Sequence, residues 1–88
     1  MIKRDITIIN ELGIHARPAG MVANTASRFA SDIKLVKDGM EVNAKSIMGI
    51  MTLAAGRGSI IEVSAKGKDE ADAVKAIEEL FVRKFDED

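Results

Sequence analysis

The stretch Gly13-Ile14-His15-Ala16-Arg17-Pro18 is the point at which the hydrophobic period of the chain changes. Before it, isoleucines alternate with charged residues and threonine, which is typical of a strand with one solvated face. After it, apolar residues recur every three or four positions, which is typical of an amphipathic helix. The pattern therefore predicts a strand over residues 2–9 and a helix from about Ala16 to Phe29.

A hairpin and a second helix are expected next. Asp38-Gly39 favours the positive φ angles of a two-residue hairpin turn, so short strands are predicted over residues 34–37 and 40–43. Ser46 opens an apolar segment, residues 47–53, that ends before two glycines. We interpret this segment as a short helix.

The last third of the chain predicts a strand and a helix. Residues 60–65 are rich in β-branched side chains, which favours a buried strand. Asp69 is expected to cap a third helix, whose core-facing stripe comprises Val74, Ile77, Leu80 and Phe81. The tail from Phe85 to Asp88 is expected to fray.

The predicted order of elements is therefore βαββαβα. Each of the three helices must bury an apolar stripe, and the polar alternates in the strands indicate a sheet with one solvated face. We expect an α/β (α+β) protein built as a two-layer, open-faced sandwich. The ferredoxin-like split βαβ fold shares the first six elements, so their order leaves the arrangement of the strands open.

Size and composition narrow the possible functions. Eighty-eight residues, 47% of them apolar, are enough for one core, so residues 1–88 are expected to form a single domain. The formal net charge is -1 and no basic cluster exceeds Lys3-Arg4, which argues against a nucleic-acid partner. With one histidine and no cysteine, we expect no metal site, and we expect no cofactor.

Cysteine usage and hydropathy indicate the compartment. A small secreted domain would often use disulfides, so a chain without cysteine is expected in the reducing cytoplasm. The N-terminus lacks the apolar core of a signal peptide, and no run of about 20 apolar residues could span a membrane. We expect no membrane insertion, and a monomer, because no large exposed apolar stripe demands a second copy.

The opening stretch also carries the strongest chemical signal, since it contains the only histidine and the only proline of the chain. A phosphoryl acceptor needs a nucleophile that titrates near neutrality, a cation and free backbone amides. His15 and Arg17 supply the first two, and a helix start supplies the third. The alternative is that a lone histidine near a strand end is a surface or helix-capping residue.

Together with Lys45-Ser46-Ile47-Met48-Gly49, this stretch resembles the HPr family of histidine-containing phosphocarrier proteins, along essentially the whole chain. The resemblance implies four antiparallel strands with three helices on one face. It also implies a relay in the phosphoenolpyruvate-dependent sugar phosphotransferase system, which accepts a phosphoryl group from enzyme I and passes it to sugar-specific IIA components. Such a carrier is not an enzyme with a turnover of its own.

The family motif implies roles for the start of the first helix. By resemblance, His15 would be phosphorylated on Nδ1, and Arg17 would stabilise the phosphoryl group. The backbone N–H groups of Ala16 and Arg17 would receive phosphoryl oxygens, because the first N–H groups of a helix have no intrahelical partner. Pro18, which has no N–H, suits the first helical turn.

Ser46 has two interpretations that can both hold. As a helix N-cap, its hydroxyl would accept a backbone hydrogen bond that contributes roughly 1 kcal/mol. By resemblance, it would be a regulatory site that HPr kinase/phosphorylase phosphorylates from ATP, with effects on a transcriptional regulator and on carbohydrate uptake. A phosphate at a helix N-terminus meets a favourable dipole, so the fold should tolerate it.

A surface for partner proteins is expected around both helix starts. In HPr-like proteins these positions form one shared surface, which here implies Gly20, Asn24, Ile47, Met48 and Met51. Flexible methionines suit a surface that meets several partners. Within the second helix, we expect two residues to point outward, Met48 and Met51, and three to point inward, Ile47, Ile50 and Leu53.

Two other functions stay open. One is a regulatory phosphocarrier of the nitrogen-related branch, with the same histidine chemistry but no sugar uptake. The other is a small ferredoxin-like binding module, which would have a ligand pocket and no covalent phosphate. The Lys45-Ser46-Ile47 segment favours the sugar branch, because the regulatory serine motif belongs to that side of the family.

Overall fold

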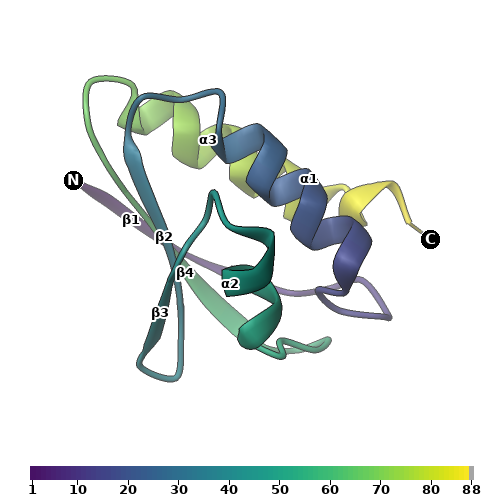
Figure 1. Cartoon of the computed structure of the whole chain (residues 1–88). Coiled ribbons are helices and arrows are strands. Elements are labelled where there is room, and N and C mark those ends of the chain that lie inside the picture. The colour runs from purple at the N-terminus through teal and green to yellow at the C-terminus, as the bar shows by residue number, and fades with distance from the viewer. Residues whose placement is uncertain (88) are drawn as a thin grey trace.

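The computed structural model describes residues 1–87, and its helices and strands follow the predicted order (Figure 1). The elements are β1 (Ile2–Thr7), α1 (Ala16–Ala26), β2 (Asp32–Lys37), β3 (Met40–Asn43), α2 (Ile47–Thr52), β4 (Ile60–Lys66), α3 (Glu70–Val82) and a short 3₁₀ turn, η1 (Lys84–Asp86). Two elements end earlier than predicted, β1 at Thr7 and α1 at Ala26. Within the described residues, no helix has the length and apolar character needed to cross a membrane.

The four strands form one antiparallel sheet in the order β1-β4-β2-β3. The last strand, β4, lies between the first two, where Ile61 faces Ile6 across one pair and Val63 faces Leu35 across the other. All three helices lie on the same side of this sheet (Figure 1). The open-faced sandwich is therefore confirmed, and the strand arrangement that element order left open is fixed by this central placement of β4.

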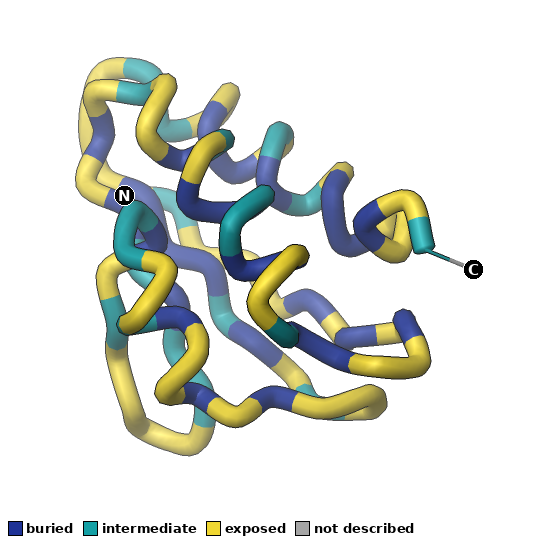
Figure 2. The backbone as a smooth tube through the Cα atoms, turned by 45° about the vertical axis from the view of Figure 1, so that its right-hand side comes forward, coloured by how far each residue is buried: buried dark blue, intermediate teal, exposed yellow. Residues whose placement is uncertain are grey.

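The core lies between the sheet and the helices. In β4, Ile61, Val63 and Ala65 are fully buried and Ser64 is buried as well, so burial alternates only over the first half of the strand. Figure 2 shows the buried positions along the chain in dark blue. The two longer helices bury residues at helical spacing: Ala19, Val22, Ala23 and Ala26 in α1, and Ala73, Val74, Ile77, Leu80 and Phe81 in α3. The hydrophobic periods of the sequence thus correspond to one continuous core.

The tail after α3 does not fray, contrary to the prediction. Phe85 is fully buried, and its ring packs edge-on against Phe81 with the ring centroids 4.9 Å apart. Lys84, Phe85 and Asp86 have φ angles of 55°, 54° and 61°, a left-handed turn that costs about 1–2 kcal/mol per residue. Burial of the Phe85 side chain contributes about 1.5–3 kcal/mol, which offsets part of this cost. Asp88, also in the predicted tail, lies outside the described residues.

Asp69 precedes α3, but its side chain does not cap that helix, which corrects the prediction. Its carboxylate instead accepts hydrogen bonds from the backbone N–H groups of Ala30 and Ser31, each at 2.9 Å, and from the Ser31 hydroxyl. The Ser31 hydroxyl and then the Ala30 amide lower the pKa of Asp69 below its ordinary 3.8. Asp69 therefore ties the loop after α1 to the start of α3.

The Asp69 carboxylate predicts that the fold is sensitive to acid. A carboxylate whose pKa is lowered on folding stabilises the folded state above its unfolded pKa, and this effect is lost as the pH falls through the folded pKa. The free energy of unfolding should therefore decrease as the pH falls below 3.8, the ordinary pKa of this carboxyl. Asp69→Asn should lower the free energy of unfolding at neutral pH and flatten this acid dependence, as measured by urea unfolding across pH.

A matched control is Asp38→Asn, which removes an exposed carboxylate from the hairpin turn. Asn-Gly suits that turn as well as Asp-Gly, so this variant should keep the acid dependence of the wild type. An Asp69→Asn variant with the same acid dependence as the wild type would contradict the prediction.

Candidate functional site

His15 occupies the N-cap position of α1 with an extended backbone, φ -98° and ψ -169°. Its side chain makes no capping hydrogen bond. Nε2 is bonded, whereas Nδ1 has no hydrogen-bond partner within residues 1–87. The side chain retains 37% exposure, so Nδ1 is left available to a group approaching from solvent.

The loop before His15 is held against the segment that follows α2. Gly13 has a φ of +68°, and a Cβ built there would lie 2.6 Å from the Ala55 carbonyl oxygen and 2.7 Å from the Cα of Gly56. The next residue, Ile14, donates its N–H to that same Ala55 oxygen at 2.9 Å. Only glycine permits this close approach of two backbones, which fixes where α1 begins.

The start of α1 leaves backbone donors free. The N–H groups of Ala16 and Arg17 have no hydrogen-bond partner in the part of the chain that the structure describes, and both residues are exposed. Pro18 has no N–H, and the first intrahelical bond runs from Ala19 N–H to the His15 carbonyl oxygen at 3.0 Å. These free donors and the helix dipole make the space beside His15 favourable for an anion.

A carboxylate from the C-terminal end of the chain contacts the ring nitrogen Nε2 of His15. Glu87 Oε2 is 2.7 Å from His15 Nε2 and 3.4 Å from Arg17 Nη1. The same Nη1 donates to the Phe85 carbonyl oxygen at 2.8 Å, whereas Arg17 Nε and Nη2 have no partner among residues 1–87. Arg17 therefore keeps free donors although it is anchored to the tail.

Asn10 connects this tail to the loop before His15. Its Nδ2 donates to Glu87 Oε1 at 3.0 Å and to the Gly13 carbonyl oxygen at 2.7 Å, and the residue is only 1% exposed. Burial acts to raise the pKa of Glu87, but hydrogen bonds from Asn10 and His15, together with the charges of His15 and Arg17, outweigh it and hold that pKa below its ordinary value. The carboxylate is therefore ionised at neutral pH.

Sequence reasoning brought His15, Ala16 and Arg17 together but missed Asn10 and Glu87. A signal for the tail was present, because Phe85 is an aromatic residue in an otherwise charged segment. An isolated phenylalanine near such a tail indicates that the tail docks on the core. The specific contact of Glu87 with His15, 72 residues apart, has no counterpart in any local pattern.

Ser46 lies at the start of α2 and caps it, as predicted. Its Oγ accepts a hydrogen bond from Gly49 N–H at 3.0 Å. The neighbouring Lys45 donates from Nζ to the Phe29 carbonyl oxygen at 2.9 Å, just beyond the end of α1. The half-buried hydroxyl therefore lies at the N-terminus of α2 with a cation on the adjacent residue.

The outer side of α2 carries exposed apolar residues. Met48 is 74% exposed, and Met51 and Ile47 are also exposed, whereas Ile50 and Leu53 are buried. The expectation that Ile47 points inward was therefore wrong, since Ile47 shares the outer side with Met51, one turn further along the helix. The two methionines and the two buried residues lie as predicted.

The α1 part of the expected partner surface is open. Asn24 is exposed and Gly20 is half-buried, and α1 and α2 contact each other. A Cβ built on Gly20 would meet nothing within 4 Å. The glycine is therefore not required for close packing, and the surface of α1 is open at this position.

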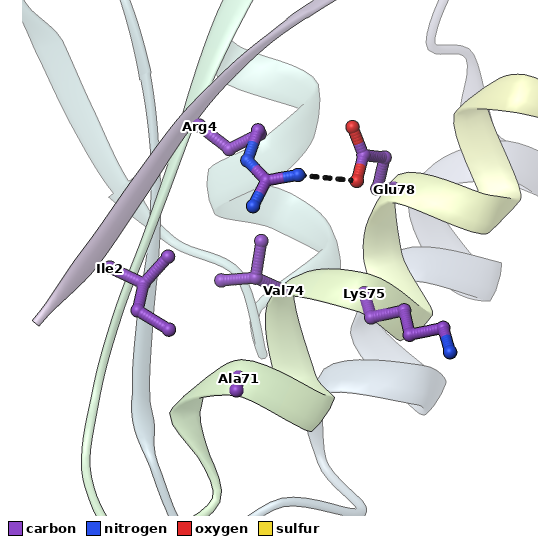
Figure 3. A pocket seen from close by; sticks show the side chains of 6 residues that line it. All are labelled: Ile2, Arg4, Ala71, Val74, Lys75 and Glu78. Carbon is purple, nitrogen blue, oxygen red and sulfur yellow. Dashed lines mark hydrogen bonds and ion pairs between the residues drawn. The ribbon is translucent and has the colours of Figure 1, made fainter.

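A separate hollow of about 390 Å³ lies between β1 and α3 (Figure 3). Arg4 Nη1 and Glu78 Oε1 form an ion pair across it at 3.0 Å. Its lining combines apolar and charged side chains: Ile2, Arg4, Ala71, Val74, Lys75 and Glu78. None of these residues belongs to the cluster around His15.

Comparisons with known proteins agree with the observed fold. A family model described as "PTS HPr component phosphorylation site" matches residues 2–83. The Phosphocarrier protein HPr of Treponema pallidum (strain Nichols) is 50% identical over 88 residues, which cover 100% of both chains. The crystal structure of HPr-C-His from Thermoanaerobacter tengcongensis matches with a TM-score of 0.96 and 48% identity, covering 100% of this chain and 99% of that chain.

One similar structure bears on the oligomeric state. The crystal structure of an HPr dimer from Thermoanaerobacter tengcongensis matches with a TM-score of 0.80 and 48% identity, covering 99% of this chain and 100% of that chain. Because a protein so similar has been crystallised as a dimer, the monomer expected from the sequence stays a prediction.

Proposed function

Since the chain belongs to the HPr family of phosphocarrier proteins of the phosphotransferase system, we propose that its His15 accepts a phosphoryl group from phospho-enzyme I and passes it to sugar-specific IIA proteins. The observation that carries this proposal is the placement of His15. Its Nδ1 is without a partner in residues 1–87, at a helix start with unpaired N–H groups on the next two residues.

Phosphoryl transfer requires the protein to position the nucleophile and to stabilise negative charge. Phosphoryl transfer through a loose, in-line transition state needs the nucleophile aligned with the donor and stabilisation of the equatorial oxygens. The amides of Ala16 and Arg17 and the free guanidinium donors of Arg17 can supply that stabilisation. The phosphohistidine P–N bond is a high-energy bond, which suits a relay because another histidine can accept the group.

The role is that of a carrier in the cytoplasm, without a cofactor and without independent turnover. Its proposed docking surface for enzyme I, IIA proteins and regulators comprises Gly20, Asn24, Ile47, Met48 and Met51. Support comes from the exposure of Ile47 and both methionines and from the empty space above Gly20. A polarizable, flexible side chain such as that of Met48 can adapt to several partners.

The central prediction is that the chain takes label from phosphoenolpyruvate in the presence of enzyme I. The phosphate should be acid-labile and base-stable, as expected of a P–N bond, and it should be absent in His15→Ala. Incubation with labelled phosphoenolpyruvate and enzyme I, followed by acid and base treatment, measures this. Stable label on His15→Ala would refute the assignment of the acceptor.

Loss of Arg17 should slow phosphoryl transfer without abolishing it. A charge-assisted contact contributes roughly 1.5 to 3 kcal/mol, so Arg17→Ala should reduce the transfer rate about 10- to 150-fold. Arg28→Ala removes the same charge near the other end of α1 and serves as the control, with a rate close to that of the wild type. Rapid-quench experiments measure the transfer rate. A rate for Arg17→Ala within twofold of the wild-type rate would overturn the prediction.

We further propose that Ser46 is phosphorylated from ATP by HPr kinase/phosphorylase as a regulatory modification. Its place at the start of α2, beside Lys45, offers a phosphate the dipole and a nearby cation. Incubation with ATP and the kinase should add one phosphate to the wild type and none to Ser46→Ala, which should also lose about 1 kcal/mol of stability with the cap. Phosphate found on the wild type at another residue would contradict the proposal.

A further inference from the structure

The turn after α3 brings a carboxylate to the imidazole of His15. Lys84, Phe85 and Asp86 all adopt left-handed φ angles, which residues with a side chain normally avoid and which persist where the surrounding structure demands them. The turn buries Phe85 in the core, and Glu87 then reaches His15 Nε2 at 2.7 Å. The strained turn thus places the Glu87 carboxylate in contact with His15, the candidate nucleophile.

The carboxylate determines which ring nitrogen carries the proton. An ionised carboxylate can only accept hydrogen bonds, so Nε2 of His15 must be the donor. A neutral imidazole that is protonated on Nε2 has its free lone pair on Nδ1. Nδ1 is also the nitrogen that faces no hydrogen-bond partner in the described residues.

Neighbouring residues hold Glu87 in this orientation. Buried Asn10 donates to the other carboxylate oxygen, Oε1, at 3.0 Å. Arg17 donates to the Phe85 carbonyl oxygen at 2.8 Å, which ties the tail to the start of α1. Both carboxylate oxygens therefore have a partner, and the group cannot rotate away from His15 without breaking them.

We propose that Glu87 is a positioning residue for phosphoryl transfer at His15, an inference that rests on the proposed function. Its carboxylate keeps the proton on Nε2 and leaves the Nδ1 lone pair to attack phosphorus. As the Nδ1–P bond forms, the P–N bond of the donor phosphohistidine breaks and its electron pair returns to the donor ring. Nε2 keeps its proton, so the ring of His15 becomes cationic, and the carboxylate stabilises that charge.

Two substitutions separate the hydrogen bond from the charge. Glu87→Gln keeps one oxygen that can accept the Nε2 proton, but it removes the charge and the second acceptor oxygen that Asn10 contacts. Glu87→Ala removes both oxygens and the charge. Neither substitution alters Phe85 or the other residues of the left-handed turn. Glu79→Gln, which neutralises an exposed carboxylate in α3, is the control.

The first measurement concerns the unphosphorylated protein. His15 is the only histidine, so one set of ring signals appears in ¹H–¹⁵N spectra of the full chain. The Nε2–H proton should be protected from exchange with water in the wild type, in Glu87→Gln and in Glu79→Gln, and should exchange rapidly in Glu87→Ala. A tail with a merely structural role would leave this signal unchanged.

The second measurement is the rate of phosphoryl transfer from phospho-enzyme I. Glu87→Ala should be about 10-fold slower than the wild type, Glu87→Gln should lie between them, and Glu79→Gln should match the wild type. A Glu87→Ala variant with an unchanged rate or a still protected Nε2–H would overturn the proposal. A wild type that shows the protected Nε2–H but accepts no phosphoryl group would instead overturn the proposed function, and with it any positioning role.

Discussion

The first N–H groups of a helix have no hydrogen-bond partner within that helix. The candidate site lies at the start of α1, where these N–H groups are found. The position of that helix start is set from two sides. Ala19 and Val22 bury the inner face of α1 in the core, while the Gly13 contact holds the entering loop against Ala55 and Gly56. The amides of Ala16 and Arg17, which have no partner within residues 1–87, therefore extend from a helix start that is packed on both sides.

Before any phosphoryl group is bound, the positive charge of Arg17 is paired with the negative charge of Glu87. Arg17 and the ring of His15 share the Glu87 carboxylate, and Asn10 holds its second oxygen. The proposed dianionic phosphoryl group on Nδ1 would add negative charge at the start of α1, where the amides of Ala16 and Arg17 have no partner among the described residues. In this arrangement the Glu87 carboxylate contacts both Nε2 of His15 and Nη1 of Arg17, whereas Nδ1 has no hydrogen-bond partner within residues 1–87.

The periodicity of the sequence predicted the helices, the strands and most of the core, because burial along each element repeats at the period of that element. Element order could not predict that β4 inserts between β1 and β2, since strand pairing is a property of the whole sheet. The predictions failed where a side chain has a partner far away in sequence. Asp69 bonds to the loop at Ala30 and Ser31 instead of to its own helix, and Phe85 and Glu87 are fixed by residues near the other end of the chain.

The distance in sequence between His15 and Glu87 has a consequence for synthesis of the protein. The two residues are 72 positions apart, so a ribosome that adds about 5–20 residues per second joins them to the chain roughly 4 to 14 s apart. The histidine, the arginine and the helix-forming residues around them exist throughout that interval, but the carboxylate does not. A nascent chain therefore carries His15 without the carboxylate that contacts it, and the complete cluster forms only when the tail has closed over the finished core.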